Sequence, residues 1–188
     1  VMDNEIYKRA LYKIAADVIK CGINVLIEKP ISDNLKKAEK LIRLAKKEEV
    51  KLAVGHVERF NPVVQKLKEL LNRKEIGTLT SIIVRRVGIY PPSRPTTNVI
   101  IDLAVHDIDV INHLLEEGEP KKIIAHKIKV RGKLEDSAEI FLRYKAATAF
   151  IQVNWITPIK IRNILLTGTN GYIEANYITQ RVVLYKNK

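Results

Sequence analysis

The hydrophobic residues of this chain change their spacing at about residue 60, and this change constrains the fold more than any other feature of the sequence. Before it, helical spacing over residues 6–20 and 35–45 alternates with short apolar runs at 23–27 and 51–56. Helix and strand in alternation with short joints predict a parallel βαβ unit, which is part of a doubly wound sheet. The run at 23–27 is almost wholly apolar and predicts a strand covered on both faces. Ser32 or Asp33 is expected to cap the second helix.

After residue 60 the strands follow one another. Pro62 begins a helix, and apolar residues at helical spacing predict another over 99–115. Strands are predicted over residues 80–88, 121–131, 136–144, 147–156, 161–167, 172–176 and 180–186. Asn170-Gly171 between apolar runs predicts a tight hairpin. Strands without intervening helices predict a mainly antiparallel sheet with the helices on one face. We therefore expect two domains, residues 1–60 and 61–188.

Composition excludes several classes of protein. Lys and Arg number 33 against 21 Asp and Glu, a net charge of +12, but the basic residues are scattered and only 6% of residues are aromatic. The pattern is that of a solvated surface, so no nucleic-acid partner is expected. No apolar run approaches the 18 residues that a membrane span needs, and the first residues do not resemble a signal peptide. The single cysteine, Cys21, cannot form an internal disulfide, which favours the cytoplasm.

Three clusters of polar residues could carry chemistry. The first, Glu28-Lys29-Pro30, follows an apolar strand. Ligands of open α/β sheets gather outside the carboxyl ends of the strands, so a charged pair is well placed there. An exposed strand end that proline terminates is an equally good interpretation.

The second cluster lies on the predicted helix 99–115. Asp102, His106, Asp109 and His113 follow one another at steps of four, three and four, which places them on one stripe. A carboxylate one turn before an imidazole can orient it as a general acid or base. A metal site is the weaker alternative, because no further His or Cys cluster supports it. Alternatively, Asp102 caps the helix, Asp109 pairs with a lysine and His106 is structural.

The third cluster, residues 55–62, reads Gly-His-Val-Glu-Arg-Phe-Asn-Pro and lies at the predicted junction of the domains. Polar residues at such a junction can line a cleft or simply tie two domains together.

Taken together, four motifs resemble one family. They are Gly22-x-Asn24-Val25-Leu26-Ile27-Glu28-Lys29-Pro30, Gly55-His56-x-Glu58-Arg59-Phe60-Asn61-Pro62, Asp102-Leu103-Ala104-Val105-His106-x-Ile108-Asp109 and Leu166-x-Gly168-Thr169-x-Gly171-x-Ile173-Glu174. In this order the chain resembles the Gfo/Idh/MocA family of NAD(P)-dependent sugar oxidoreductases over nearly its whole length. Within it, the run at 55–62 is most similar to the UDP-N-acetylglucosamine 3-dehydrogenase branch. The resemblance implies a partial Rossmann-like domain followed by a glyceraldehyde-3-phosphate-dehydrogenase-like domain with an open, mainly antiparallel sheet.

The resemblance also implies site residues. Lys29 would be the catalytic lysine, His106 the acid/base that takes a substrate hydroxyl proton, and Asp102 a positioning group. Lys29 would share the contact with NAD or NADP with three further residues, Glu28, Pro30 and His56. No metal is implied. An ammonium and an imidazole that converge on one hydroxyl would stabilise the developing alkoxide and lower the pKa of the imidazole.

Substrate and partner follow from the same resemblance. A secondary alcohol of a sugar or nucleotide sugar would be oxidised, with C3 of UDP-N-acetylglucosamine as the specific candidate. Contacts to the substrate are expected from Arg59, Tyr90, Arg94 and Asn98, since a guanidinium suits a pyrophosphate. A homo-oligomer through the open sheet is expected.

One departure from the family is large. Members carry a Gly-x-Gly-x-x-Gly turn that holds the pyrophosphate, whereas Gly22 is the only glycine before Gly55 here. We therefore expect a fragment that lacks the first third of the usual domain, binds dinucleotide poorly and turns over little or nothing. A non-catalytic binding or assembly module that keeps the fold is the alternative.

Overall fold

The computed structural model describes residues 4–32, 34–92 and 97–187, except the side chains of residues 4–10. The chain forms two compact units, Val1–His56 and Val57–Lys188. The division falls slightly before the predicted one, so a short 3₁₀ helix, η1 (Val57–Phe60), belongs to the second unit.

The smaller unit is a single βαβ arrangement preceded by a helix. Its elements in chain order are α1 (Asn4–Lys20), β1 (Val25–Glu28), α2 (Leu35–Lys47) and β2 (Leu52–Gly55). The two strands pair in parallel, with Val25 opposite Leu52 and Glu28 opposite Gly55. This confirms the predicted parallel unit.

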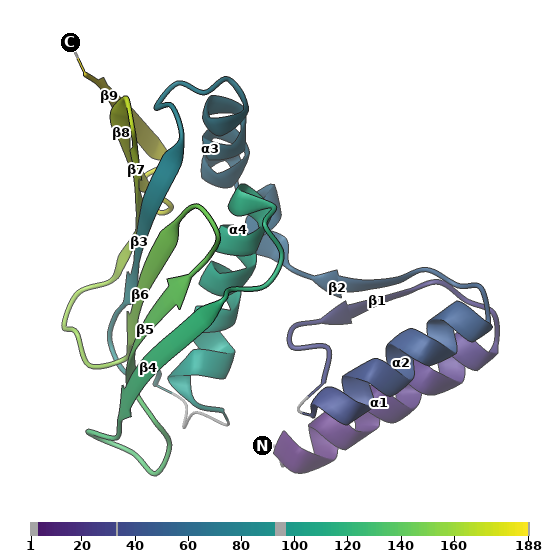
Figure 1. Ribbon diagram of the computed structural model, residues 1–188. Coiled ribbons are helices and arrows are strands. Elements are labelled where there is room, and N and C mark those ends of the chain that lie inside the picture. The colour runs from purple at the N-terminus through teal and green to yellow at the C-terminus, as the bar shows by residue number, and fades with distance from the viewer. Residues whose placement is uncertain (1–3, 33, 93–96, 188) are drawn as a thin grey trace. The chain divides into compact units, whose positions relative to one another are not determined.

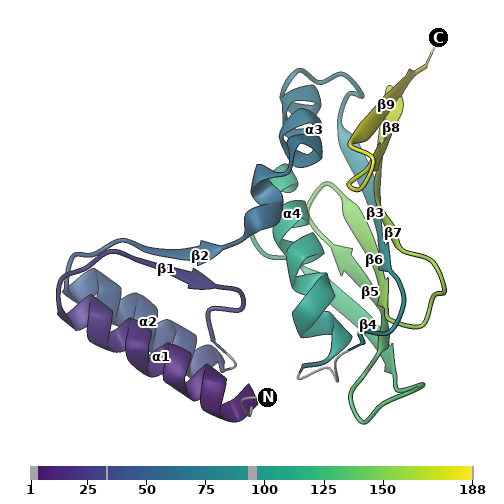
Figure 2. The ribbon, with the colours of Figure 1, turned by 180° about the vertical axis from the view of Figure 1, so that it is seen from behind.

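Both helices of the smaller unit pack on one face of its two-stranded sheet (Figures 1 and 2). Its core combines Ile19 of α1, Ile27 of β1 and Leu41 of α2, all nearly inaccessible to solvent. The prediction that the first strand is covered on both faces is wrong for this unit. Leu26, whose side chain points away from the helices, is 73% exposed.

Asn34 caps α2, one or two residues beyond the predicted caps. Its side-chain oxygen accepts a hydrogen bond from the backbone N–H of Lys37, as expected of an Asn at this position. Ser32 instead accepts from the N–H of Asn34, and Asp33 lies outside the described residues.

The larger unit combines helices with a seven-stranded sheet. The helical elements after η1 are α3 (Pro62–Asn72), the π-helical turn η2 (Ile100–Ala104) and α4 (Val105–Leu115). The strands are β3 (Leu79–Val87), β4 (Lys122–Ile128), β5 (Ser137–Arg143), β6 (Thr148–Asn154), β7 (Ile161–Gly168), β8 (Gly171–Asn176) and β9 (Arg181–Lys186).

The strand order is β4-β5-β6-β3-β7-β8-β9. β3 inserts between β6 and β7, and its pairing with β6 is parallel, whereas every other neighbouring pair is antiparallel. The mainly antiparallel sheet predicted from the sequence is therefore confirmed.

Helices α3 and α4 lie on one face of this sheet, the inner face, and leave the outer face bare (Figures 1 and 2). Alternate strand residues such as Ile151 and Ile164 meet Leu67 of α3 and Ile111 of α4 in one continuous core. Each such aliphatic side chain contributes about 1.5–3 kcal/mol on burial, so this core sets the position of α4 on the sheet.

The predicted Asn-Gly hairpin joins β7 to β8, with Gly168 opposite Gly171. Glycine is required at Gly168 because a Cβ there would overlap the carbonyl oxygen of Ile76. The Gly-Thr-Asn-Gly motif is thus explained by a close approach of two backbones.

Candidate active site

In the smaller unit, the polar residues of the first cluster lie at the carboxyl edge of the parallel strands. Glu28 is exposed, and its carboxylate leans over Gly55, where an added Cβ would lie 3.5 Å from Glu28 Oε2. Lys29 and Pro30 follow β1 and His56 follows β2, and all three are half-buried. Because parallel strands end at the same edge, an ammonium, an imidazole and a carboxylate share one edge of this sheet.

This donor set fits one end of a dinucleotide and not the other. An open strand edge with Lys29 and His56 can receive a nicotinamide ring and its ribose. The pyrophosphate needs a glycine turn at a helix N-terminus, and the described part of the unit contains no such turn.

In the larger unit, Asp102 and His106 lie on the helical segment that crosses the inner face. Asp102 belongs to the π turn η2 and His106 to the first turn of α4, and both are half-buried. Backbone hydrogen bonds in a π segment join residues five positions apart, whereas those of an α-helix join residues four apart. π turns recur at functional sites. The predicted continuous helix over 99–115 therefore consists of a π turn followed by an α-helix.

Asp109 of the same stripe is held by Arg59. The guanidinium donates from Nε to Oδ2 at 2.8 Å and from Nη2 to Oδ1 at 2.5 Å, a two-point pair between η1 and α4. The structural alternative expected Asp109 to pair with a lysine, whereas the ion pair seen among the described residues is with Arg59. Arg59 keeps a side chain that is 44% exposed, and its predicted contact with substrate stays a prediction.

A buried ionic cluster includes Asp107, the residue that follows His106. Arg86 of β3 donates from Nε to both oxygens of Asp107 at 2.9 Å and from Nη1 to Glu58 Oε1 at 2.9 Å. Arg86 is 5% exposed and Asp107 is fully buried. The Arg86 guanidinium also lies 5.4 Å from the ring centre of Tyr177. One side chain therefore joins η1, β3 and α4.

Burial dominates the electrostatics of this cluster. It raises the pKa of Asp107 to about 6, against the opposing pull of the Arg86 charge. It also raises the pKa of Tyr177, and the carboxylate of Asp107 raises it further. Arg86 Nη2 and the Tyr177 hydroxyl find no hydrogen-bond partner within the described residues.

None of the predicted pairings included this cluster, although the sequence pattern contains a signal for it. Arg86 alternates with Ile82 and Val84 of the inner face, and Asp107 precedes Val110 and Ile111 by three and four residues. Arg86 therefore takes an apolar position in the strand pattern, and Asp107 takes one in the helix pattern. Opposite charges at two such positions indicate a buried ion pair.

The described residues on either side of positions 93–96 are anchored within the larger unit. Tyr90 is half-buried and meets Trp155 edge to face, with ring centres 6.1 Å apart. Asn98 accepts from the Ile101 N–H at 3.0 Å and donates to Glu135 at 3.4 Å, so Asn98, and not Asp102, caps the start of the helical segment. Arg94 lies outside the described residues.

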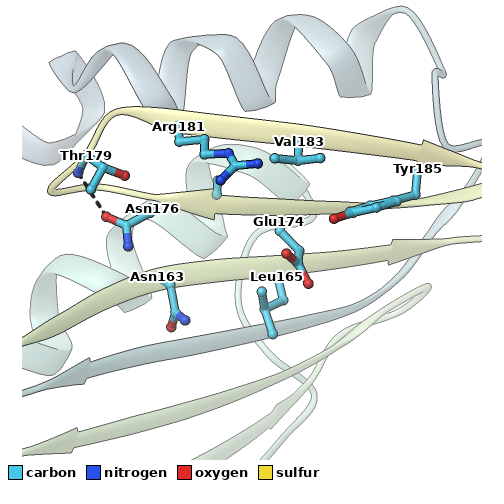
Figure 3. Close-up of a pocket in the computed structure, with 9 residues that line it drawn as sticks. Asn163, Leu165, Glu174, Asn176, Thr179, Arg181, Val183 and Tyr185 are labelled. Atoms are coloured by element: carbon cyan, nitrogen blue, oxygen red, sulfur yellow. Dashed lines mark hydrogen bonds between the residues drawn. The ribbon is translucent and has the colours of Figure 1, made fainter.

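The outer face of the large sheet carries a shallow hollow of about 650 Å³ over β7, β8 and β9 (Figure 3). Its lining is mixed, with Glu174, Arg181 and Tyr185 beside the apolar Leu165 and Val183. None of the predicted site residues lines it, because α4 lies on the inner face.

No group of three or more His, Cys, Asp or Glu residues in the described ranges could hold a metal ion. Likewise, no helix within those ranges is long and apolar enough to cross a membrane.

A βαβ unit followed along the chain by an open sheet with helices on one face defines a two-unit α/β architecture, and comparison with known proteins identifies its class. Residues 8–56 match the family described as the oxidoreductase family with an NAD-binding Rossmann fold. Residues 64–174 match the GFO/IDH/MocA C-terminal domain. The chain therefore belongs to the GFO/IDH/MocA oxidoreductase family.

Relatives within the family differ in substrate. The chain is 23% identical to UDP-N-acetylglucosamine 3-dehydrogenase of Acidithiobacillus ferrooxidans, over 93% of this chain and 54% of that protein. It is 29% identical to myo-inositol 2-dehydrogenase of Thermotoga maritima, over 88% of this chain and 53% of that protein. The chain thus spans about half the length of the curated relatives it matches.

Solved structures share the fold. The structure of the A. ferrooxidans enzyme matches with a TM-score of 0.86 at 21% identity, over 96% of this chain and 59% of that chain. The WlbA dehydrogenase of Bordetella pertussis, in complex with NADH and UDP-GlcNAcA, matches with a TM-score of 0.83 at 19% identity, over 95% of this chain and 56% of that chain.

Proposed function

We propose that the chain serves NAD(P)-dependent oxidation of a secondary alcohol on a sugar or nucleotide sugar. The observation that carries this proposal is the joint match of a single chain to both domains of one oxidoreductase family. Lys29 at the strand edge and His106 on α4 supply the two groups that such a reaction needs.

The chemistry assigned to each residue follows from its charge and exposure. The Lys29 ammonium, half-buried at the strand edge, stabilises the negative charge that develops on the substrate oxygen. An imidazole nitrogen of His106 accepts the hydroxyl proton, and Asp102 positions the hydroxyl and the imidazole. A bound nicotinamide ring would supply the hydride acceptor, with Glu28, Pro30 and Lys29 around it.

For the substrate, we propose UDP-N-acetylglucosamine, oxidised at C3. Two relatives support a nucleotide sugar by their names or ligands, the A. ferrooxidans dehydrogenase and the B. pertussis dehydrogenase with UDP-GlcNAcA. The main alternative substrate is an uncharged polyol, because another relative is named as a myo-inositol dehydrogenase.

A single-turnover assay tests the proposal. The chain, in excess over UDP-N-acetylglucosamine, is incubated with millimolar NAD⁺, and mass spectrometry measures loss of two hydrogens from the sugar. We expect a slow but measurable 3-keto product that Lys29→Met and His106→Asn each abolish. The matched controls are Lys36→Met in the same unit and His126→Asn on exposed β4, which should leave the product unchanged. Product formation that Lys29→Met and His106→Asn leave unchanged would contradict the proposal.

We also propose that the chain forms a homo-oligomer through the outer face of the large sheet. The strand registers place one row of residues across all seven strands on this face: Ile124, Phe141, Phe150, Ile83, Leu165, Glu174 and Val183. Six of the seven are apolar, and Phe150 near the centre is 38% exposed. An apolar row of this length on a bare sheet is typical of a protein interface.

The proposed location is the cytoplasm. An NAD(P)-linked reaction and a single exposed cysteine, Cys21, suit a reducing compartment.

A further inference from the structure

Arg162 of β7 is a charged residue on the inner face of the large sheet that no predicted role includes. It alternates with the buried Ile164 and Leu166, so its side chain emerges on the side of the sheet that α3 and α4 cover. Its register partner on β3 is Arg86, which places two guanidinium groups opposite each other. Like charges directly opposite on neighbouring strands are unfavourable, so this arrangement requires a reason.

The two arginines are satisfied very differently. Arg86 is surrounded by the carboxylates of Asp107 and Glu58. Arg162 uses Nη1 alone, which donates to the backbone oxygens of Val87 at 2.6 Å and Ile161 at 2.8 Å. Within the described residues no carboxylate forms an ion pair with Arg162, and its Nε and Nη2 carry no hydrogen bond.

The side chain of Arg162 lies beside Gly88 and is not fully buried. Gly88 follows the last residue of β3, and a Cβ at this glycine would lie 3.9 Å from Nη1. The side chain as a whole is half-buried, so solvent or a ligand can reach it. Burial lowers the pKa of Arg162 and the charge of Arg86 lowers it further, while the carboxylates of Asp107, Glu58 and Asp102 raise it. An arginine stays protonated under all of these influences.

The register places Arg162 beside Arg86, and Arg86 is bonded to Asp107, the residue that follows His106 on α4. A guanidinium fixed by one nitrogen and offering two others in a plane is the arrangement that recognises phosphate or carboxylate oxygens. The carbonyls of Val87 and Ile161 hold the group in one orientation before any ligand binds, which reduces the entropy lost on binding.

We propose that Arg162 binds a phosphate of the substrate and thereby selects phosphorylated sugars over neutral ones. The assignment deepens the proposed function, because it concerns the substrate of the same site. It also gives a physical reason for a preference for a nucleotide sugar over an uncharged polyol such as inositol. The wholly structural alternative is that Arg162 only ties the ends of β3 and β7 together.

Calorimetry on the whole chain at low salt tests the assignment, with UDP-N-acetylglucosamine, inorganic pyrophosphate, uncharged N-acetylglucosamine and NAD⁺ as separate ligands. Arg162→Gln should weaken binding of UDP-N-acetylglucosamine and pyrophosphate by about tenfold to a hundredfold, the usual effect of losing charge-assisted hydrogen bonds. Arg162→Lys keeps the charge but loses the planar donors, so its affinity for these ligands should lie between those of wild type and Arg162→Gln. Arg85→Gln is the matched control, because Arg85 is the exposed neighbour of Arg86 and points to the outer face.

The outcomes separate this assignment from the proposed function. Pyrophosphate binding that depends on Arg162, without binding of UDP-N-acetylglucosamine, supports the assignment and contradicts the proposed substrate. Equal affinity of Arg162→Gln and Arg85→Gln for UDP-N-acetylglucosamine overturns the assignment and leaves the proposed function standing. The assignment is also overturned if wild type binds neither phosphorylated ligand, or if Arg162→Gln weakens the binding of NAD⁺ alone. Urea unfolding of each variant verifies its fold, and Arg162→Lys provides the test if Arg162→Gln does not fold.

Discussion

Replacing Arg86 by methionine is the perturbation whose effect the structure defines most sharply. The change removes three hydrogen bonds of 2.9 Å, two to Asp107 and one to Glu58, and keeps most of the side-chain volume. Asp107 is fully buried, so its carboxylate would be left without a cation in a medium that solvates it poorly.

The expected loss of stability at neutral pH is about 3–5 kcal/mol, the usual cost of removing one partner from a buried ion pair. A domain of this size has a total stability of about 5–15 kcal/mol, so the variant should remain folded but be visibly weakened. The loss should shrink toward pH 5. Burial already raises the pKa of Asp107 to about 6, and without the charge of Arg86 the neutral acid forms more easily still.

Urea unfolding followed by tryptophan fluorescence measures this loss. Trp155 is the only tryptophan in the chain and is buried in the larger unit, so the signal reports on the unit that holds the cluster. Arg85→Met, on the exposed side of the same strand, is the control and should change stability by less than about 0.5 kcal/mol. The double variant Arg86→Met/Asp107→Leu should recover most of the loss. A loss below about 1 kcal/mol for Arg86→Met at pH 7, or no recovery in the double variant, would refute the ionic cluster.

Three further outcomes are expected. The folded state holds the proton of Asp107 more tightly than the unfolded state, with a pKa of about 6 against 3.8, so this group makes stability fall as the pH rises from about 4 to 6. Asp107→Asn should remove that fall in urea titrations, and an unchanged pH dependence would show that another group causes it. Phe150→Glu should shift the chain to a monomer in light scattering whereas Ile178→Glu, on the β8–β9 turn, should not; equal behaviour of the two variants would argue against the outer face as the interface. Calorimetry should show weak binding of NAD⁺ to these 188 residues, which contain no Gly-x-Gly-x-x-Gly run, and an affinity typical of dehydrogenases would contradict the expectation.

Much of the fold follows from hydrophobic spacing, and the misses have definite physical causes. The strands of the large sheet were predictable because Asn170-Gly171 and alternating apolar residues mark local hairpins. The parallel pairing of β3 with β6 was not, because it joins segments far apart in the sequence. Leu26 was expected to be buried because a wholly apolar strand carries no signal of which face a helix covers.

The sequence nominates candidate site residues but says little about how they are connected. The family resemblance singles out Lys29, Asp102 and His106, but it cannot show that the backbone at Asp102 forms a π turn. The partners of a charged residue depend on tertiary packing, so the pairing of Asp109 with Arg59 and of Asp107 with Arg86 became visible only in the structure.

A double-variant cycle on sugar oxidation tests the central proposal, that Lys29 and His106 serve one reaction. The rate of 3-keto product formation from UDP-N-acetylglucosamine is measured for wild type, Lys29→Met, His106→Asn and the combined variant. When two groups act in one step, removing either of them removes most of the effect of both. Each single variant should therefore lower the rate by about a hundredfold or more, and the combined variant should lower it little further. A single variant with the wild-type rate, or a combined loss equal to the product of the two single losses, would contradict the account.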